Sequence, residues 1–203
     1  DFLNLIPIYK IRNYYYKNKG DWKFENMAGK WVTAKASWSN GAAYADLDAD
    51  GDLDYLVNNI DDQAFVFENL ARQKTDANYL QCKLEGSPKN PMGTGATVTI
   101  YQGDQQQYAM LSPNRGIFSA VEHLLHFGVG KASNIDRLQV RWPDGKAQTL
   151  TNVPVNQRIT LKYSDANETA PPKTWYKGPT LLNNQTQTAA LDFEHVENDF
   201  NDF

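Results

Sequence analysis

The sequence predicts an all-β protein. Apolar and polar residues alternate in several short segments, among them Leu80–Leu84, Leu138–Trp142 and Ile159–Tyr163. This period of two is typical of strands with one buried face. Turn-forming clusters such as Gln102-Gly103-Asp104 and Pro143-Asp144-Gly145 separate the segments, and both have the residues that tight turns favour. Because no long segment keeps a helical period, we expect strands joined by short turns.

The composition excludes several classes of protein. The 203 residues are 41% hydrophobic and carry a net charge of -4, without a basic patch interleaved with aromatics, so nucleic acid is not an expected partner. No apolar run approaches the about 18 residues of a transmembrane segment. Cys82 is the single cysteine. It can form neither an internal disulfide nor a zinc site, and we expect it to pack as a small hydrophobic residue.

One loop carries an unusual density of negative charge. Between residues 46 and 54 a carboxylate recurs at every second position, with Gly51 where the chain must turn. Like charges this close repel one another unless a cation neutralises them. Oxygen ligands on a flexible loop suit Ca²⁺ better than Mg²⁺, which requires strict octahedral geometry. The sequence therefore predicts a calcium site, with the predicted metal residues Asp46, Asp48, Asp50, Asp52 and Asp54.

Three structural interpretations of this loop differ in what they require of its flanks. An EF-hand needs a glutamate at its twelfth position, which here is Val57, and a helix on each side; a dockerin-like loop also needs helices. A β-hairpin loop instead fits the strand-like flanks 42–45 and 55–57. In this interpretation Asp52 contributes its carbonyl and the other four aspartates their side chains. The remaining alternative is a solvated acidic turn without metal.

The hairpin and its surroundings resemble a known repeat. Residues 41–59 are similar to an FG-GAP or VCBS repeat, the blade unit of integrin-α-type β-propellers. Residues 13–26 resemble the strands that precede such a loop, and residues 65–69 resemble the start of a further repeat. The resemblance implies one or more partial propeller blades with calcium in the hairpin loop. It also implies that aromatic residues such as Tyr14, Tyr16 and Trp22 are buried between sheets.

A second resemblance covers the middle of the chain. The segments Asn78–Gly86, Gly93–Val98, His126–Gly130 and Val140–Gly145 resemble an ASPIC/UnbV domain, which follows FG-GAP repeats in cartilage-acidic-protein-like and bacterial surface proteins. This resemblance implies a small β-sandwich-like domain.

The two resemblances divide the chain into four parts. We expect a blade region at 1–72, an UnbV domain at 73–163, a polar and proline-containing linker at 164–190, and the start of a following repeat unit at 191–203. A single blade region cannot close a propeller, which takes about four to eight blades. We therefore interpret the chain as an internal fragment of a larger protein.

No group of residues predicts catalysis. The glycines around His126 indicate a tight turn and a structural role for that histidine. Ser119, His123 and Asp136 lack the context of a nucleophile elbow. The acids Glu68, Glu85 and Glu122 lack any spacing that marks a glycosidase pair.

These observations favour a binding protein without enzymatic activity. We expect a calcium-stabilised adhesion or binding protein, extracellular or on a bacterial outer-membrane surface, that recognises a protein or a glycan. Its resemblance to surface proteins suggests a SusC/SusD-like nutrient transporter as a further partner. The alternative is a polysaccharide hydrolase or lyase that uses the propeller as a platform.

Overall fold

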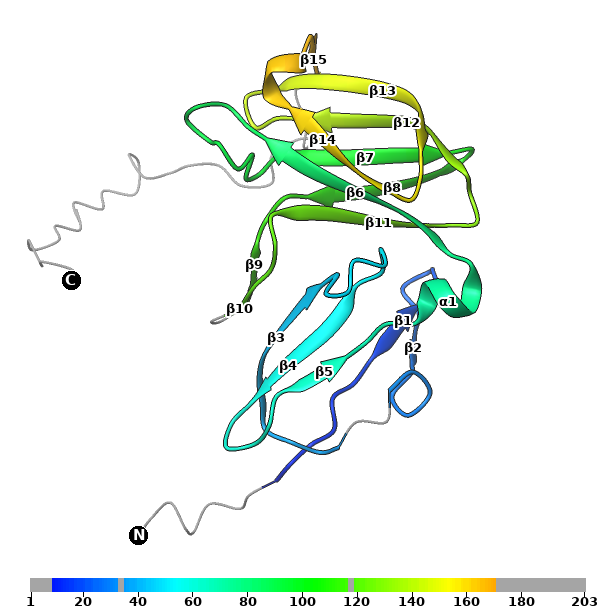
Figure 1. Cartoon of the computed structure of the whole chain (residues 1–203), viewed down its shortest axis with the longest axis vertical. Helices are drawn as coiled ribbons and strands as arrows, with labels where there is room; N and C mark the ends of the chain where they lie inside the picture. Colours follow the sequence, from blue (N-terminus) through cyan, green and yellow to red (C-terminus); the bar gives the residue numbers. More distant parts are fainter. Residues whose placement is uncertain (1–8, 33–34, 117–118, 171–203) are drawn as a thin grey trace, which may run out of the picture. The chain divides into compact units, whose positions relative to one another are not determined.

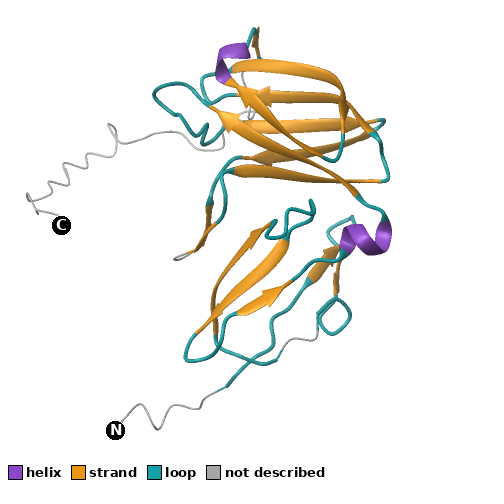
Figure 2. Cartoon of the chain, in the orientation of Figure 1, coloured by secondary structure: helices purple, strands orange, loops and turns teal. Residues whose placement is uncertain are grey.

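The all-β prediction is confirmed. The structure is a computed structural model that describes residues 9–32, 35–116 and 119–170. Within these ranges the elements are strands, apart from the short helix α1 (Ala71–Thr75) and a 3₁₀ turn at Tyr163–Asp165 (Figures 1 and 2).

The first part of the chain forms two small antiparallel sheets. Strand β1 (Tyr16–Asn18) pairs with β2 (Phe24–Asn26), and β3 (Ser39–Ala45), β4 (Asp54–Asn59) and β5 (Phe65–Phe67) form a sheet in that order. The last pair of the β3–β4 ladder brings residue 45 opposite residue 54. The aspartate loop therefore closes a β-hairpin, as the flanking sequence predicts, and the arrangement agrees with a partial propeller blade.

The predicted burial of three aromatics in this part is wrong. Tyr14, Tyr16 and Trp22 are exposed, whereas Tyr15 is half-buried with its ring edge-to-face against Tyr55, centroids 5.8 Å apart. Adjacent residues of an extended segment point to opposite faces, so a ring directed at the β3–β4–β5 sheet leaves its neighbours outside. Burial also raises the pKa of the Tyr15 hydroxyl. Within the described ranges β1 and β2 pair only with each other.

The second part of the chain is a sandwich of two sheets. In the smaller sheet β6 (Asn78–Glu85) lies between β11 (Leu124–Gly130), which is antiparallel to it, and β14 (Gln157–Lys162), which is parallel. The larger sheet has the order β15-β13-β12-β7-β8. Its strands are β7 (Thr97–Gln102), β8 (Gln105–Met110), β12 (Asn134–Arg141), β13 (Lys146–Pro154) and β15 (Glu168–Thr169). A separate hairpin pairs β9 (Asn114–Gly116) with β10 (Ser119–Ala120).

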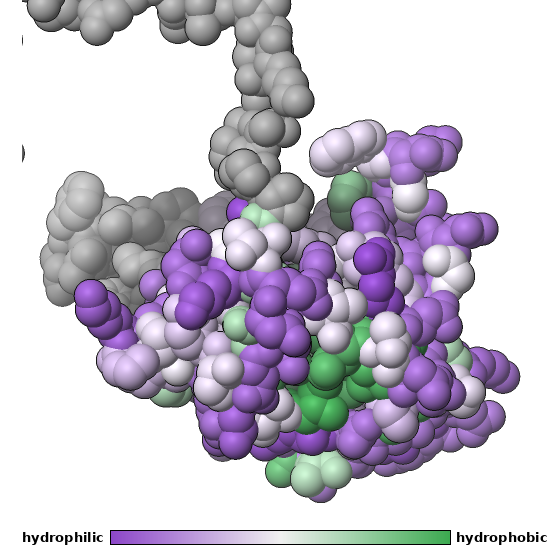
Figure 3. Space-filling view, turned by 90° about the horizontal axis from the view of Figure 1, so that it is seen from above, coloured by the Kyte–Doolittle hydropathy of each residue, from purple (hydrophilic) through white to green (hydrophobic). Residues whose placement is uncertain are grey.

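One hydrophobic core joins the two sheets of the sandwich. The core consists of the inward-facing side chains of strands from both sheets. Examples are Leu80 and Leu84 of β6, Leu138 and Val140 of β12, and Trp142 just after β12. Hydrophilic residues predominate on the face of the molecule in Figure 3, around one compact hydrophobic area. The small β-sandwich-like domain implied by the second resemblance is therefore present.

Cys82 belongs to this core, as expected, and its thiol should therefore react slowly. Burial raises the pKa of its thiol to about 12, and the thiolate is the reactive form. Near pH 8 the native thiol should react with a disulfide reagent about a thousandfold more slowly than an ordinary cysteine thiol. The measurement is the rate of thiol modification with and without denaturant. Equal rates in both conditions would show that the sandwich does not bury this side chain.

The sandwich continues beyond the boundary expected at residue 163. Strand β15 pairs with β13, and the Glu168 carboxylate accepts hydrogen bonds from the backbone N–H and the hydroxyl of Thr149, at 3.0 and 2.9 Å. Strand pairing of the sandwich therefore extends through Thr169, into the segment expected to be linker. The remaining parts of the predicted linker and of the following unit, residues 171–190 and 191–203, lie outside the described residues.

The turn predicted around His126 is instead a strand. His126 pairs with Gln81 in the β11–β6 ladder, and the register shifts between Gly128 and Gly130. Gly130, at φ +59°, adopts a conformation that favours glycine. These glycines therefore lie at an irregularity near the end of β11. The predicted structural role of His126 is compatible with its position in the strand.

Candidate metal site

The aspartate loop is a compact hairpin connection whose side chains bond to its own backbone. The carboxylate of Asp48 accepts the N–H of Asp50 at 3.2 Å, and that of Asp50 accepts the N–H of Asp52 at 3.0 Å. Asp and Asn favour this bond to a backbone N–H two residues on. Ala49 and Gly51 have φ values of +60° and +95°, which bring the chain round in a few residues.

Three of the predicted ligands converge. Carboxylate oxygens of Asp46, Asp48 and Asp50 lie within 4.8 Å of one another. One oxygen of Asp46 and one of Asp52 are buried without a hydrogen-bond partner. Buried polar atoms almost always have a partner, and a buried anionic oxygen without one is costly. The donor set and these two oxygens fit a hard cation, so this cluster could hold a metal ion.

The electrostatics of Asp52 point in the same direction. The residue is only 7% exposed. Burial, and then the negative charges of Asp50, Asp54 and Asp48, raise the pKa of its carboxyl, while the bond that it accepts from the backbone N–H of Arg72 lowers it. The ionised form is therefore disfavoured in the folded loop, and a bound cation would reverse that cost.

Asp54 has a different local role. It is buried, and its two carboxylate oxygens accept the backbone N–H groups of Leu47 at 2.9 Å and Asn69 at 2.8 Å. It thus fastens the start of the loop to the segment that follows β5. Asp52 and Asp54 lie outside the convergent group of three, and their predicted coordination of the metal stays a prediction.

Residues beyond the loop also hold it, and no sequence pattern pointed to most of them. Asn69 donates from its amide to the carbonyl of Leu53 at 3.2 Å, and the guanidinium of Arg72 donates to the carbonyl of Asp50. From the sandwich, the amide of Gln81 donates to Asp46 at 2.8 Å. Only Asn69 lies in a segment already noted for its resemblance to a repeat.

Gly51 lies directly against the ring of Tyr79, so a Cβ at this position would overlap the ring. The same ring lies 5.0 Å from the Arg72 guanidinium and is stacked with His126, at a centroid distance of 5.8 Å. Burial lowers the pKa of His126, and the nearby Asp46 opposes this effect. Position 51 therefore requires glycine for two reasons: its φ is positive, and a side chain there would meet the Tyr79 ring.

Three of the carboxylates considered for catalysis take part in local contacts of the described chain. Asp136 accepts the backbone N–H of Gly103 at 2.7 Å, which fixes the β7–β8 turn. Glu85 faces Lys162 at 3.8 Å and Glu122 faces Arg158 at 4.0 Å, both on exposed surface. Each of these carboxylates has a local structural partner.

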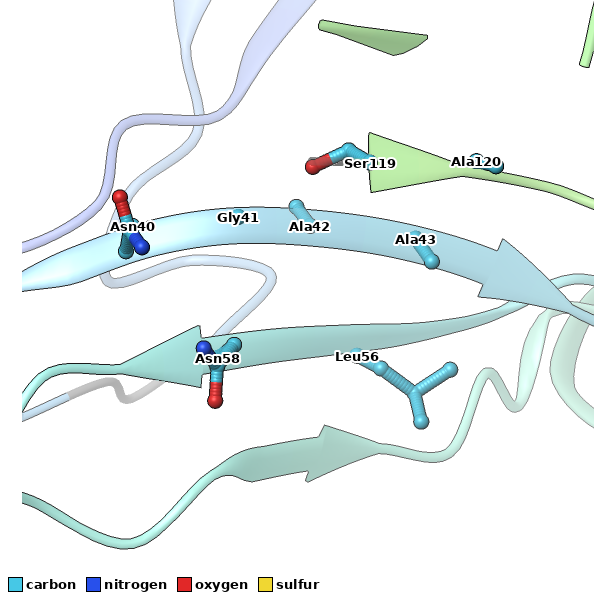
Figure 4. A pocket seen from close by; sticks show the side chains of 8 residues that line it. All are labelled: Asn40, Gly41, Ala42, Ala43, Leu56, Asn58, Ser119 and Ala120. Carbon is cyan, nitrogen blue, oxygen red and sulfur yellow. The ribbon is translucent and has the colours of Figure 1, made fainter. Parts of the chain in front are cut away.

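A shallow groove lies beside β3 and β4. The side chains that line it are mostly small or carry an amide or a hydroxyl group. Figure 4 shows Asn40, Gly41, Asn58 and Ser119 among them. The residues that line it are Asn40, Gly41, Ala42, Ala43, Leu56, Asn58, Ser119 and Ala120. None of them carries a carboxylate or an imidazole.

Comparison with protein families agrees with this architecture. The model of the FG-GAP-like repeat matches residues 9–57, which include β1 to β3, the aspartate loop and most of β4. The model named ASPIC and UnbV matches residues 86–168, most of the sandwich. The chain carries an FG-GAP-like repeat followed by an ASPIC/UnbV domain. A search among curated proteins found no match.

Both domains fit an extracellular or surface protein. Within the described residues, no helix has the length and apolar character needed to cross a membrane. The FG-GAP-like match ends inside β4, so the strand β5, the helix α1 and the residues that fasten the loop lie outside both matched segments.

Proposed function

We propose that this chain is part of a calcium-stabilised extracellular or cell-surface binding protein without enzymatic activity. The observation that carries the proposal is the convergence of Asp46, Asp48 and Asp50 beside two buried oxygens without partners. Calcium, with six to eight oxygen ligands and flexible geometry, suits such a loop better than magnesium does.

The surroundings of the loop support a structural role for the ion. Asp52 and Asp54 direct carboxylate oxygens to backbone N–H groups of the segment that follows β5, and Asp46 is bonded to Gln81 of the sandwich. A cation at the loop would therefore reinforce contacts between three parts of the fold. Extracellular modules of this kind bind calcium with dissociation constants of about 10⁻⁴–10⁻³ M.

Removal of calcium tests the proposal directly. Protein saturated with calcium should melt at a higher temperature than protein in excess chelator, because an ion that binds only the folded state stabilises it. Calorimetric titration of the chelated protein should show calcium uptake, with magnesium as the competing ion. An unchanged melting curve together with no heat of binding would refute the metal site.

Asp48 offers a milder test, because its side chain is exposed and its loss should not disturb the core. Asp48→Asn keeps the acceptor for the N–H of Asp50 and removes one negative charge. We expect calcium affinity to fall at least about tenfold, since ligand charge tunes the affinity of such loops. Asp104→Asn, in the exposed β7–β8 turn, is the matched control and should bind calcium as the wild type does. Equal affinity of Asp48→Asn and wild type would remove Asp48 from the ligand set.

The recognised ligand is proposed to be a protein or a glycan at the cell surface. The groove beside β3 offers amide and hydroxyl groups suited to polar ligands, and exposed aromatics such as Tyr14 and Trp22 offer stacking surfaces. A bacterial outer-membrane location beside a SusC/SusD-like transporter is the more specific form of the proposal. Affinity purification of the full-length protein from membranes should then recover a transporter, and recovery of none would contradict that form.

A polysaccharide hydrolase or lyase is the alternative. Glycoside hydrolysis uses two carboxylates that flank the scissile bond, and the absence of acids from the groove lining favours binding instead. A glycan panel separates the two functions. Binding without release of reducing ends supports the binding protein, whereas release of reducing ends by the wild-type protein establishes the enzyme.

A further inference from the structure

Gln81 stands out because it is a polar residue that is almost completely buried at the edge of the aspartate loop. It lies on β6 between the core residues Leu80 and Cys82, yet it is only 3% exposed. Both ends of its amide are bonded. The Nε2 group donates to Oδ2 of Asp46 at 2.8 Å, and Oε1 accepts from Nε of Arg158 at 2.9 Å.

The order of these bonds fixes the orientation of the amide. A guanidinium can only donate hydrogen bonds, so Arg158 must donate to the carbonyl oxygen of Gln81. The NH₂ group of Gln81 is then the end that donates to a carboxylate. The bond to Asp46 occupies Oδ2, while Oδ1 of the same carboxylate is buried without a partner. Asp46 is therefore held in one orientation, with one of its oxygens not used by any hydrogen bond in the described structure.

Tyr79 extends the same contact along β6. Residues 79 and 81 are two apart on a strand, so their side chains share one face. The Tyr79 ring lies against Gly51 and beside Arg72, whose backbone N–H is bonded to Asp52. This face of β6 thus supports the loop at two points, at Asp46 through Gln81 and at Gly51 through Tyr79.

We propose that Gln81 is a positioning residue of the metal loop, held in place by Arg158, so that the β-sandwich sets the calcium affinity of the aspartate loop. This inference rests on the calcium site proposed above. Groups that orient a metal ligand without touching the metal change affinity by about 10- to 100-fold when they are removed. Calcium binding at the repeat would, by the same linkage, stabilise its contact with the sandwich.

The test compares calcium binding by three variants of the chain. Gln81→Met keeps the length of the side chain and removes both hydrogen bonds, and its calcium dissociation constant should rise about tenfold. Arg158→Met leaves Gln81 in place and releases its carbonyl end, so its rise should be smaller. Gln139→Met is the matched control, since Gln139 is half-buried in the other sheet, where its amide lies 3.5 Å from the hydroxyl of Thr149; its dissociation constant should not change.

Melting curves with and without calcium distinguish positioning from a purely structural role. A structural role would lower the melting temperature of Gln81→Met equally in both conditions, whereas positioning shrinks the increase that calcium produces. Wild-type affinity in both Gln81→Met and Arg158→Met would overturn the inference while leaving the metal site intact. No calcium uptake by the wild type would instead refute the proposed function itself. If Gln81→Met fails to fold, Arg158→Met alone decides, because the Arg158 side chain is half-exposed.

Discussion

Replacement of Trp142 by alanine should cost the sandwich about 3–5 kcal/mol of unfolding free energy, the range for removing a large aromatic from a core. The side chain is 2% exposed and packs edge-to-face on Tyr163, with ring centroids 5.6 Å apart. It also lies over Gly93, where an added Cβ would come within 3.0 Å of the indole. Because neighbouring side chains in a packed core relax only in part, the cavity left by the indole should collapse only in part.

Urea denaturation followed by far-ultraviolet circular dichroism measures this loss. Total stabilities of 5–15 kcal/mol are usual, so Trp142→Ala is expected to lower the denaturation midpoint sharply or to leave the domain unfolded. Trp22→Ala is the control, because Trp22 is 94% exposed, and surface substitutions stay within about 0.5 kcal/mol. Equal midpoints for the two variants would contradict the assigned core.

Trp142→Phe separates packing from hydrogen bonding. The indole Nε1 of Trp142 is buried without a partner, a donor that normally finds one. Phenylalanine removes that unsatisfied group along with some volume. The loss should therefore be clearly smaller than for alanine.

The sequence predicted those features that depend on local pattern. The strands at Leu80–Leu84, Leu138–Trp142 and Ile159–Tyr163 follow from alternation. The turn after Trp142 follows from Pro143-Asp144-Gly145, where the N–H of Gly145 bonds to the carbonyl of Trp142 at 3.0 Å. Cys82 and its neighbours alternate as a strand with one core face. In each case the information lies within a few residues, so the local propensities and the fold agree.

Long-range contacts could not be predicted in the same way. Gln81 alternates with core residues, so its position predicts a side chain that faces solvent. In the structure it is buried and bonded to Asp46, which lies 35 residues away in the sequence. The exposure of Tyr14 and Tyr16 depends likewise on which of three consecutive tyrosines faces β4. Such choices are made by the register and contacts of separate segments, which periodicity alone does not specify.

Replacement of Gly51 by alanine should release the loop from the sandwich and abolish calcium binding at millimolar concentrations. Two costs add. At φ +95° an L-residue is strained by about 1–2 kcal/mol, and the new Cβ would overlap the ring of Tyr79. That ring cannot simply swing aside, because it lies between Gly51, Arg72 and His126.

A double-mutant cycle identifies the cause of this loss. Tyr79→Ala removes the ring that the Cβ would meet, so Gly51→Ala should be less harmful in that background than in the wild type. The part that remains is the backbone strain, which the ring does not affect. Calcium affinity and melting temperature are measured for both single variants and for the double variant. Strictly additive effects would mean that the contact between Gly51 and Tyr79 contributes nothing, and that the loop is held by its hydrogen bonds to neighbouring segments.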